Sequence, residues 1–376
     1  MSVPYAVAAA SPRRAIEARA PEVVMPFIDH ARGHAVHEVA SLHAASLRVS
    51  ALLGCADSGD AGADVTRAGP RYWLPMRTLL REEADLLAID GEDCLWGGVV
   101  PHAFVGTKLV SHRLWPGGSG APEGWRDVPG VDDCTLPGWS VFSRSDALAA
   151  CAALLEDGPV RAKSPYARGG NDQARFADMR EARDWLDSGA SIGIEHGLVL
   201  ERDIVETVTY GVGSARIGRH AIAYYGTQRA VRDRAGRLVY GGTRLTAFRG
   251  GLRELCATLP HGEAREAVDM AMRFDRAVRA TYAVLASRCN YDVIVGHERD
   301  GRRRCGVLEQ SWRFGGASMA ELLALERFAQ DPARHWLVAE TAESYDDLEP
   351  PPDSVVVWPG DAGSPCKYAR IVDDGY

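Results

Sequence analysis

Short apolar runs alternate with segments of helical periodicity along most of the chain. The run VVMPFI at 23–28 precedes an Ala/Leu/Val pattern that reaches Leu53. This order predicts a buried strand followed by a helix, which is the start of an α/β unit. A polar, Gly-rich stretch at 54–71 then separates this unit from a second predicted helix near 75–88 and an apolar segment at 95–105.

The second half of the chain also predicts a mixture of strands and helices. The Pro- and Gly-rich segment 116–138 is typical of a loop. We expect helices at 144–156, 177–188, 262–287 and 318–329, strands at 160–163, 197–201 and 354–358, a β-rich region at 205–248 and a hairpin at 290–312. The pattern therefore favours an α/β or α+β fold.

Composition narrows the class of protein. A chain of 376 residues has room for two or three packed units. Its net charge of −8 argues against a general nucleic-acid or membrane-surface binder, because both need a basic face. The eight cysteines stand singly without a CxxC pair, and no secretory signal or apolar stretch of membrane-spanning length is present. We expect reduced thiols and a cytoplasmic protein.

The segment 289–318 carries the most informative polar pattern. Two apolar runs flank Asp300-Gly301, a dipeptide suited to a two-residue hairpin turn. Counting back along both strands from that turn pairs Asp292 with Glu309. Directly opposed side chains point to the same face of a sheet, so two carboxylates are expected to lie together.

Period-two alternation adds Ser311 and Arg313 to that predicted face. Opposed like charges destabilise a sheet unless something neutralises them. A divalent cation is one solution, since hard cations take oxygen ligands together with substrate phosphates. Neutralisation by Arg302–Arg304 or by other basic side chains is the alternative, and both interpretations stay open.

Lys163 ends the predicted strand 160–163 and precedes a loop that contains Gly169 and Gly170. A lysine beside a glycine loop suits phosphate binding, because backbone N–H groups can close on the anion. The segment is not a P-loop, and an ordinary surface loop is the alternative.

Three further residues carry weaker signals. Glu201 ends the predicted strand 197–201 and Glu206 opens the next one. Carboxylates there could accept hydrogen bonds from an adenine amine or ribose hydroxyls, or they are exposed charges at strand ends. Lys108 is expected to start a helix, and alone it would be a solvated lysine.

His30, His34 and His37 are spaced at i, i+4 and i+7. On a helix this spacing could place metal ligands on one face. They follow the first predicted strand, however, where substrate loops gather in open α/β folds. A role at the substrate or a simple polar role is therefore favoured over zinc.

The candidate residues follow one order along the chain: Lys108, Lys163 with its glycine loop, Glu201, Glu206, Asp292 and Glu309, then a polar residue two positions later. This order resembles the ATP-grasp superfamily, which includes D-alanine–D-alanine ligase and biotin carboxylase. The resemblance covers residues 100–320 well and the N-terminal region loosely. Within the superfamily the chain is most similar to a bacterial family catalogued only as a domain of unknown function.

The resemblance implies an ATP-grasp fold with an N-terminal open-sheet α/β domain and a two-part ATP-binding region. The expected divisions are a flexible lead-in at 1–20, an N-terminal domain at 21–105, a central lid subdomain at 106–202, a C-terminal ATP-grasp subdomain at 203–349 and a C-terminal extension at 350–376. ATP would lie between the lid and the C-terminal subdomain.

The resemblance also implies a role for each residue. The ATP site would comprise Lys108 and Lys163 at the phosphates, Arg168, Gly169 and Gly170 in a closing loop, Glu201 and the hinge Arg202 to Ile204 at the adenine, and Glu206 at the ribose. Asp292, Glu309 and Ser311 would hold Mg²⁺. Arg313 and Lys163 would be catalytic, with Arg313 steadying a developing negative charge.

Two positions depart from the family pattern. The family usually has Asn two residues after the metal-binding Glu, where this chain has Ser311, whose hydroxyl reaches less far. The D-alanine ligase branch carries Arg two residues before the metal-binding Asp. Asn290 stands there, which argues against a D-alanine ligase.

The activity that the resemblance implies is a carboxylate–amine ligase: the γ-phosphoryl group of ATP activates an acid as an acyl phosphate, which an amine then attacks. The implied cofactors are ATP and Mg²⁺, with Mn²⁺ as an alternative. The partners would be small-molecule acids and amines, without nucleic acid or membrane, and a homodimer is left open. Substrate contacts are expected near His30–His37, Pro101-His102, Arg244 and Arg313. A phosphotransferase and a non-catalytic nucleotide-binding protein are the alternatives.

Overall fold

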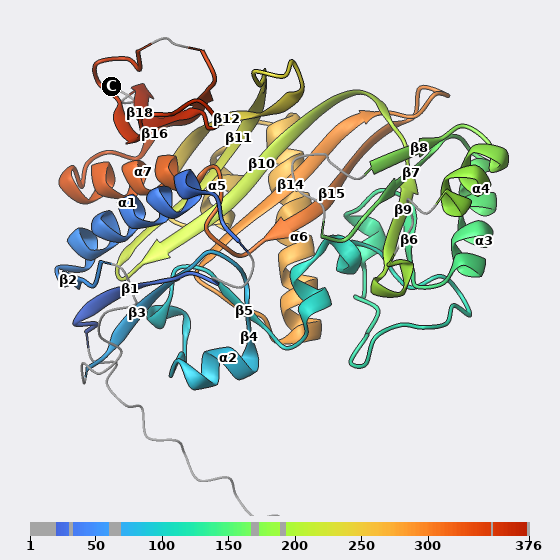
Figure 1. Ribbon diagram of the computed structural model, residues 1–376, viewed down its shortest axis with the longest axis horizontal. Helices are drawn as coiled ribbons and strands as arrows, with labels where there is room; N and C mark the ends of the chain where they lie inside the picture. Colours follow the sequence, from blue (N-terminus) through green and yellow to red (C-terminus); the bar gives the residue numbers. More distant parts are fainter. Residues whose placement is uncertain are drawn as a thin grey trace, which may run out of the picture.

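A computed structural model describes residues 20–29, 33–59, 69–166, 173–188, 193–346 and 349–373. The largest sheet in these residues has eight strands, which run diagonally across Figure 1. Its strand order is β15-β14-β10-β11-β12-β16-β18-β17, and every adjacent pair is antiparallel. The strands are β10 (Val205–Ile217), β11 (His220–Arg232), β12 (Leu238–Arg249), β14 (Arg288–His297), β15 (Arg303–Ser311), β16 (Trp336–Ser344), β17 (Val355–Trp358) and β18 (Cys366–Asp373).

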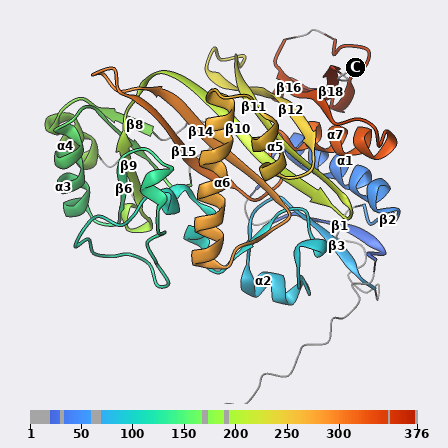
Figure 2. The ribbon, with the colours of Figure 1, turned by 180° about the vertical axis from the view of Figure 1, so that it is seen from behind.

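Helices cover both faces of this sheet. On the face seen in Figure 1, α1 (Val36–Leu53) and α7 (Ser318–Gln330) share a core with Leu245 and Ala339 of the sheet. On the other face, seen in Figure 2, α5 (Leu252–Thr258) and α6 (Glu263–Tyr282) share a core with Val212 and Val293. The sheet is therefore the middle layer of three.

The amphipathic pattern of α6 explains its place. Its buried residues recur at helical spacing, from Ala267 and Val268 through Phe274 to Val278. The helix ends at Tyr282, earlier than the predicted 287, because Ala283 adopts the left-handed conformation with φ +48° and the chain then enters β13 (Leu285–Ala286).

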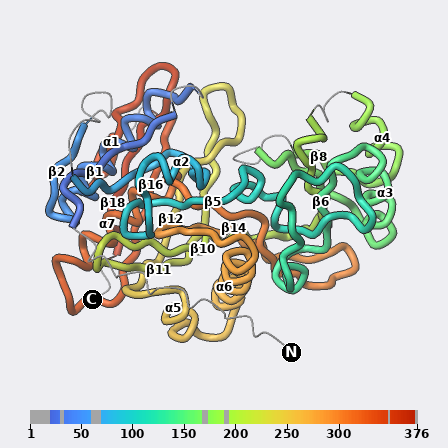
Figure 3. The backbone as a smooth tube through the Cα atoms, turned by 90° about the horizontal axis from the view of Figure 1, so that it is seen from below, coloured from blue at the N-terminus to red at the C-terminus, as the bar shows by residue number. Residues whose placement is uncertain are grey.

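A four-stranded sheet with its own core lies to one side of the large sheet (Figure 3). Its order is β6-β9-β7-β8, and α3 and α4 pack on it. The elements are β6 (Gly138–Val141), α3 (Arg144–Leu155), β7 (Val160–Lys163), β8 (Gln173–Phe176), α4 (Met179–Asp187) and β9 (Leu198–Arg202). Only Asp203 and Ile204 separate β9 from β10 of the large sheet.

The N-terminal part contains two small sheets. One is a parallel sheet of β2 (Ala56–Asp57), β1 (Val23–Phe27) and β3 (Arg71–Pro75), and the other joins β13, β5 (Gly98–Val100) and β4 (Leu79–Leu80). The helix α2 (Arg81–Leu86) is shorter than the predicted 75–88, because β3 and β4 take up its first residues.

Five 3₁₀ turns complete the described elements: η2 (Glu92–Cys94), η3 (Ala103–Gly106), η4 (Lys108–Ser111), η5 (Val131–Asp133) and η6 (Ile194–His196). The predicted α/β (α+β) class is confirmed. Among the described residues, no helix is both long and apolar enough to cross a membrane.

Candidate active site

The turn of the β14–β15 hairpin holds three residues. The backbone N–H of Glu298 donates to the carbonyl oxygen of Arg302 at 2.9 Å, which leaves 299–301 as the loop. Gly301 has φ +84°, the left-handed conformation that a three-residue hairpin needs at this position. The predicted two-residue turn at Asp300-Gly301 is therefore wrong.

A bulge in β15 restores the predicted register at Asp292. Near the turn Val293 pairs with Val307, one position out of the predicted register, but beyond the bulge Asp292 pairs with Glu309. The extra residue is Leu308, which no residue of β14 opposes. The predicted pairing of Asp292 with Glu309 is confirmed, although the path to it was wrong at the turn.

Asp292 and Glu309 lie among polar side chains. Asn290 Nδ2 and Gln228 Nε2 lie 3.2 Å and 3.1 Å from Asp292 Oδ1, and Lys108 Nζ lies 3.0 Å from Glu309 Oε2. Burial and the charge of Glu309 raise the pKa of Asp292 to about 6, while the amide donors and Lys108 oppose the rise. We call Lys108, Asp292 and Glu309 the acidic cluster.

The edge strand β15 positions Lys108. Gln310 Nε2 donates to the carbonyl oxygen of Thr107 at 2.6 Å, and Ser111 Oγ donates to that of Leu308 at 3.3 Å. These bonds fix η4 against β15 on both sides of the lysine. Lys108 thus begins a 3₁₀ turn, and its side chain is buried beside Glu309 rather than solvated.

A second cluster lies in the four-stranded sheet. Lys163 at the end of β7 forms an ion pair with Glu201 of β9, and His112 Nε2 lies 3.2 Å from the other oxygen of Glu201. All three residues are at most 5% exposed. Burial alone would raise the pKa of Glu201, but the Lys163 ammonium and His112 outweigh it and lower this pKa to about 2. We call these three residues the buried cluster.

One 3₁₀ turn joins the two clusters. Lys108 is the first residue of η4, and His112 is its C-cap. At about 2 Å of rise per residue, the two ends of the turn are roughly 8 Å apart. The two predicted phosphate lysines therefore belong to neighbouring clusters on facing sheets.

The chemistry of the two clusters fits a magnesium nucleotide. The acidic cluster holds two carboxylates and one ammonium, so its oxygen atoms and excess negative charge would suit a hard cation. Within the described residues, no group of three or more His, Cys, Asp or Glu side chains gathers as a metal site. Further protein ligands would therefore be neutral oxygens, and Asn290 and Ser311 are paired on the same face.

Arg202 does not share the face of the buried cluster. It lies opposite Val160, on the side of β9 that packs on α3, and its Nη2 lies 2.9 Å from Asp157 Oδ2. Its side chain is therefore directed away from Lys163 and Glu201. Ile204 is buried at the link between the two sheets.

Glu206 lies in an irregular part of β10. The register shifts between Val205 and Val208, and Glu206 has φ +51°, a left-handed conformation that is uncommon for residues other than glycine. Its exposed carboxylate lies 3.7 Å from His297 Nδ1.

Arg313 lies beyond the end of β15, so strand alternation does not place it on the face of Asp292 as predicted. Its Nη1 donates to the carbonyl oxygen of Phe314 at 2.8 Å. The predicted closing-loop residues Arg168, Gly169 and Gly170 lie outside the described residues.

The expected substrate residues are dispersed. His30 lies outside the described residues, and α1 begins at Val36, so of these three histidines only His37 lies in that helix. In the strand register Arg244 lies on the face of the sheet opposite Asp292. His102 stacks on Phe104 with ring centroids 5.4 Å apart.

Sequence reasoning missed several polar residues near the clusters. His112 stands four positions after Lys108 and Asn290 two before Asp292, and both spacings were visible signals. No sequence signal pointed to Gln228, because only the register of β11 brings this residue near Asp292. The carboxylate of Asp203 accepts hydrogen bonds from Arg161 and Arg175, which flank the buried cluster.

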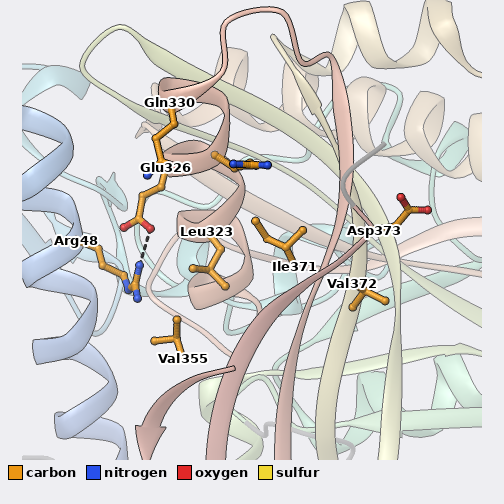
Figure 4. Close-up of a pocket in the computed structure, with 9 residues that line it drawn as sticks. Arg48, Leu323, Glu326, Gln330, Val355, Ile371, Val372 and Asp373 are labelled. Carbon is orange, nitrogen blue, oxygen red and sulfur yellow. Dashed lines mark hydrogen bonds and ion pairs between the residues drawn. The ribbon is translucent and has the colours of Figure 1, made fainter. Parts of the chain in front are cut away.

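A cavity of about 550 Å³ lies elsewhere, between α1, α7 and the C-terminal strands (Figure 4). Arg48 and Glu326 form an ion pair across it, and Leu323, Val355 and Ile371 line it. It shares no residue with either cluster. A second cavity of about 420 Å³ lies around Arg234 and Pro350, also apart from the clusters.

A family profile described as "Protein of unknown function (DUF3182)" matches residues 27–369. A search of the curated proteins gave no match.

Solved structures give weaker likenesses. D-cycloserine synthetase DcsG is 15% identical, with 78% of this chain and 92% of that chain covered and a TM-score of 0.43. The biotin carboxylase–β,γ-ATP complex from Campylobacter jejuni is 9% identical (94% and 88% covered, TM-score 0.49). Carboxyaminoimidazole ribonucleotide synthase from Aspergillus clavatus complexed with ATP is 10% identical (94% and 94% covered, TM-score 0.47). At these identities and TM-scores the likenesses establish no function.

Proposed function

The chain belongs to the DUF3182 family of proteins of unknown function, and we propose that it is an ATP- and Mg²⁺-dependent ligase of the ATP-grasp type. One observation carries the proposal: a single 3₁₀ turn joins two clusters, with Lys108 beside the opposed carboxylates Asp292 and Glu309 at one end and His112, whose partner Glu201 also pairs with Lys163, at the other. Lysines suit phosphates, and opposed carboxylates suit a hard cation.

In this proposal Lys108 and Lys163 bind the phosphates of ATP. Asp292 and Glu309 hold Mg²⁺, which when bound offsets the phosphate charge and orients the group to be transferred. Each lysine must then exchange its present carboxylate partner, Glu309 or Glu201, for a phosphate oxygen. Glu201 pairs with the Lys163 ammonium until that exchange.

The proposed reaction makes an acyl phosphate from an acid and ATP, and an amine then displaces the phosphate. Arg313 is the proposed cation for the negative charge that develops on the acyl oxygen. Exclusion of water matters here because an acyl phosphate hydrolyses readily, and we assign that role to the segment around Arg168, Gly169 and Gly170. Glu206 is the proposed ribose contact, and the backbone of Arg202 to Ile204 lies at the adenine.

Purified protein with ATP, Mg²⁺ and mixed acids and amines tests the proposal. Acid-dependent release of ADP together with an amide product is the expected result. A phosphorylated product formed without amine would make the protein a phosphotransferase instead. Nucleotide binding without turnover of any acid would make it a non-catalytic nucleotide-binding protein.

A further inference from the structure

The amide of Asn290 stands between the acidic cluster and a buried ion pair. Arg288 and Glu321 form that pair, with Nη2 to Oε1 at 2.6 Å and Nε to Oε2 at 2.9 Å, and they are 2% and 0% exposed. The buried Tyr224 hydroxyl lies 2.6 Å from Glu321 Oε1 and 3.0 Å from Asn290 Oδ1. These contacts form a continuous polar path from the core to Asp292.

The orientation of the Asn290 amide depends on which group receives the single hydroxyl proton of Tyr224. A tyrosine hydroxyl carries one proton, and the charged carboxylate of Glu321 is both the nearer and the stronger acceptor. In the metal-free protein Nδ2 of Asn290 can donate to Asp292. If a cation replaces that hydrogen bond and Tyr224 donates to Glu321, the tyrosine oxygen can accept only from Asn290, so Nδ2 turns to face Tyr224. Rotating an amide by 180° exchanges its oxygen and nitrogen with little change of shape. Oδ1 of Asn290 then faces Asp292.

The turned amide brings two oxygens to the spacing of ligands on one cation. The Asn290 atom that faces Asp292 Oδ1 lies 3.2 Å from it. Adjacent ligands of an octahedral Mg²⁺, with bonds of about 2.0–2.1 Å, are roughly 2.9 Å apart. Two acceptor oxygens at such a distance repel one another unless a cation lies between them.

We infer that Asn290 is a third oxygen ligand of the cation held by Asp292 and Glu309, and that Tyr224, Glu321 and Arg288 fix the orientation of its amide. The inference rests on the proposed cation site and adds a ligand to it. Asn290 is a ligand because it contacts the cation, whereas the other three are positioning residues.

The opposite strand is held by the same buried guanidinium. Asn290 pairs with Ser311 across the two strands. Arg288 Nη1 donates to the carbonyl oxygens of Ser311, at 3.4 Å, and of Arg313. Arg288 therefore fixes the spacing between the strands that carry Asp292 and Glu309. The amide of Asn290 also reaches further than the hydroxyl of Ser311, so it is the better placed neutral ligand of this pair.

Mn²⁺ is a suitable probe, because free and bound Mn²⁺ are counted directly by electron paramagnetic resonance. Mn²⁺ is titrated into the full chain with a non-hydrolysable ATP analogue. Asn290→Ala should weaken Mn²⁺ binding by about tenfold or more. Asn290→Asp, which keeps an oxygen, should retain binding. Ser214→Ala is the matched control, since Ser214 contacts Cys289 on the other face of the same strands and should leave the affinity unchanged.

A second variant tests the positioning residues. Tyr224→Phe keeps the ring and removes the hydroxyl, so it should weaken Mn²⁺ binding by a few fold. In the Asn290→Ala background the same change should have no further effect, because Tyr224 acts through Asn290. Equal effects in both backgrounds would refute the positioning role. Near-ultraviolet circular dichroism checks that each variant is folded.

Comparing Asn290→Ala with Asp292→Asn distinguishes an error about Asn290 from an error about the whole cation site. If Asn290→Ala binds Mn²⁺ as the wild type does while Asp292→Asn loses it, Asn290 is no ligand and the cation site stands. If neither change alters Mn²⁺ binding, the cation site itself is wrong.

Discussion

The two clusters at the ends of η4 contain similar groups and differ in charge balance. In the buried cluster one carboxylate, Glu201, has an ammonium and a histidine as partners. In the acidic cluster two carboxylates share the single ammonium of Lys108. The pKa values reflect this charge balance: the pKa of Glu201 is lowered to about 2, and the pKa of Asp292 is raised to about 6.

Under the proposed function, this difference separates a cluster whose charges are paired within the protein from one that would take up another cation. A buried charge without a partner is strongly destabilising, so Glu201 and Lys163 depend on one another. Asp292 and Glu309 repel one another, so their cluster is destabilised until a cation arrives. The same substitution, carboxylate to amide, should therefore act in opposite directions in the two clusters.

Lys163→Met should have the largest effect. It removes a proposed phosphate contact and leaves Glu201 buried without its ammonium, which costs about 3–5 kcal/mol of folding free energy. We expect loss of nucleotide binding by calorimetry and a matching fall in stability in urea melts.

The double variant Lys163→Met with Glu201→Gln separates these two effects. It should recover stability, because no charge is left unpaired, but not nucleotide binding. Wild-type affinity for ATP in this double variant would remove Lys163 from the proposed site.

Lys108→Met should change metal binding in an unexpected direction. In the nucleotide-free protein the ammonium 3.0 Å from Glu309 competes with any added cation. Without it, Mn²⁺ should bind the nucleotide-free protein about tenfold more tightly, or ~1.4 kcal/mol, while affinity for the nucleotide falls. Weaker Mn²⁺ binding in this variant would mean that Lys108 does not compete for the metal position.

Asp292→Asn should stabilise the metal-free protein in a pH-dependent way. The pKa of Asp292 is raised from 3.8 to about 6, so the folded state binds this proton more tightly than the unfolded state. Asp292 therefore favours folding at low pH, and that contribution is lost as the pH rises through about 6.

Urea melts in EDTA measure this effect. Asn cannot ionise, so at pH 7.5 the variant should be more stable than the wild type by about 1–3 kcal/mol, and the gain should vanish near pH 3.5. A variant that is less stable at pH 7.5 would show that Lys108 already neutralises the pair in the wild type.

Local patterns predicted the elements that carry these residues. The strand at 160–163 was predicted with the bounds that β7 has, and α7 begins at the predicted residue 318. Such elements depend on apolar spacing and on stop signals within a few residues. The pairing of Asp292 with Glu309 was also predicted, but only because the longer turn and the bulge at Leu308 compensate one another.

The composition of each cluster could not be predicted, because it depends on contacts between distant segments. His112 contacts Glu201 because hydrogen bonds to β15 fix η4 at the edge of the large sheet. Gln228 reaches Asp292 through β10, whose register with β11 and β14 the sequence does not specify. Arg202 was predicted at the adenine, yet strand alternation turns its side chain to the other face of β9.

In the proposed function, the acidic cluster binds a divalent cation together with the nucleotide. Calorimetric titration of the wild type and Glu309→Gln with a non-hydrolysable ATP analogue, once with Mg²⁺ and once with EDTA, tests it most directly. If the cluster binds the cation, Mg²⁺ should strengthen binding of the analogue to the wild type by about tenfold or more and should have little effect on Glu309→Gln. An equal response to Mg²⁺ in both proteins, or none in the wild type, would contradict it.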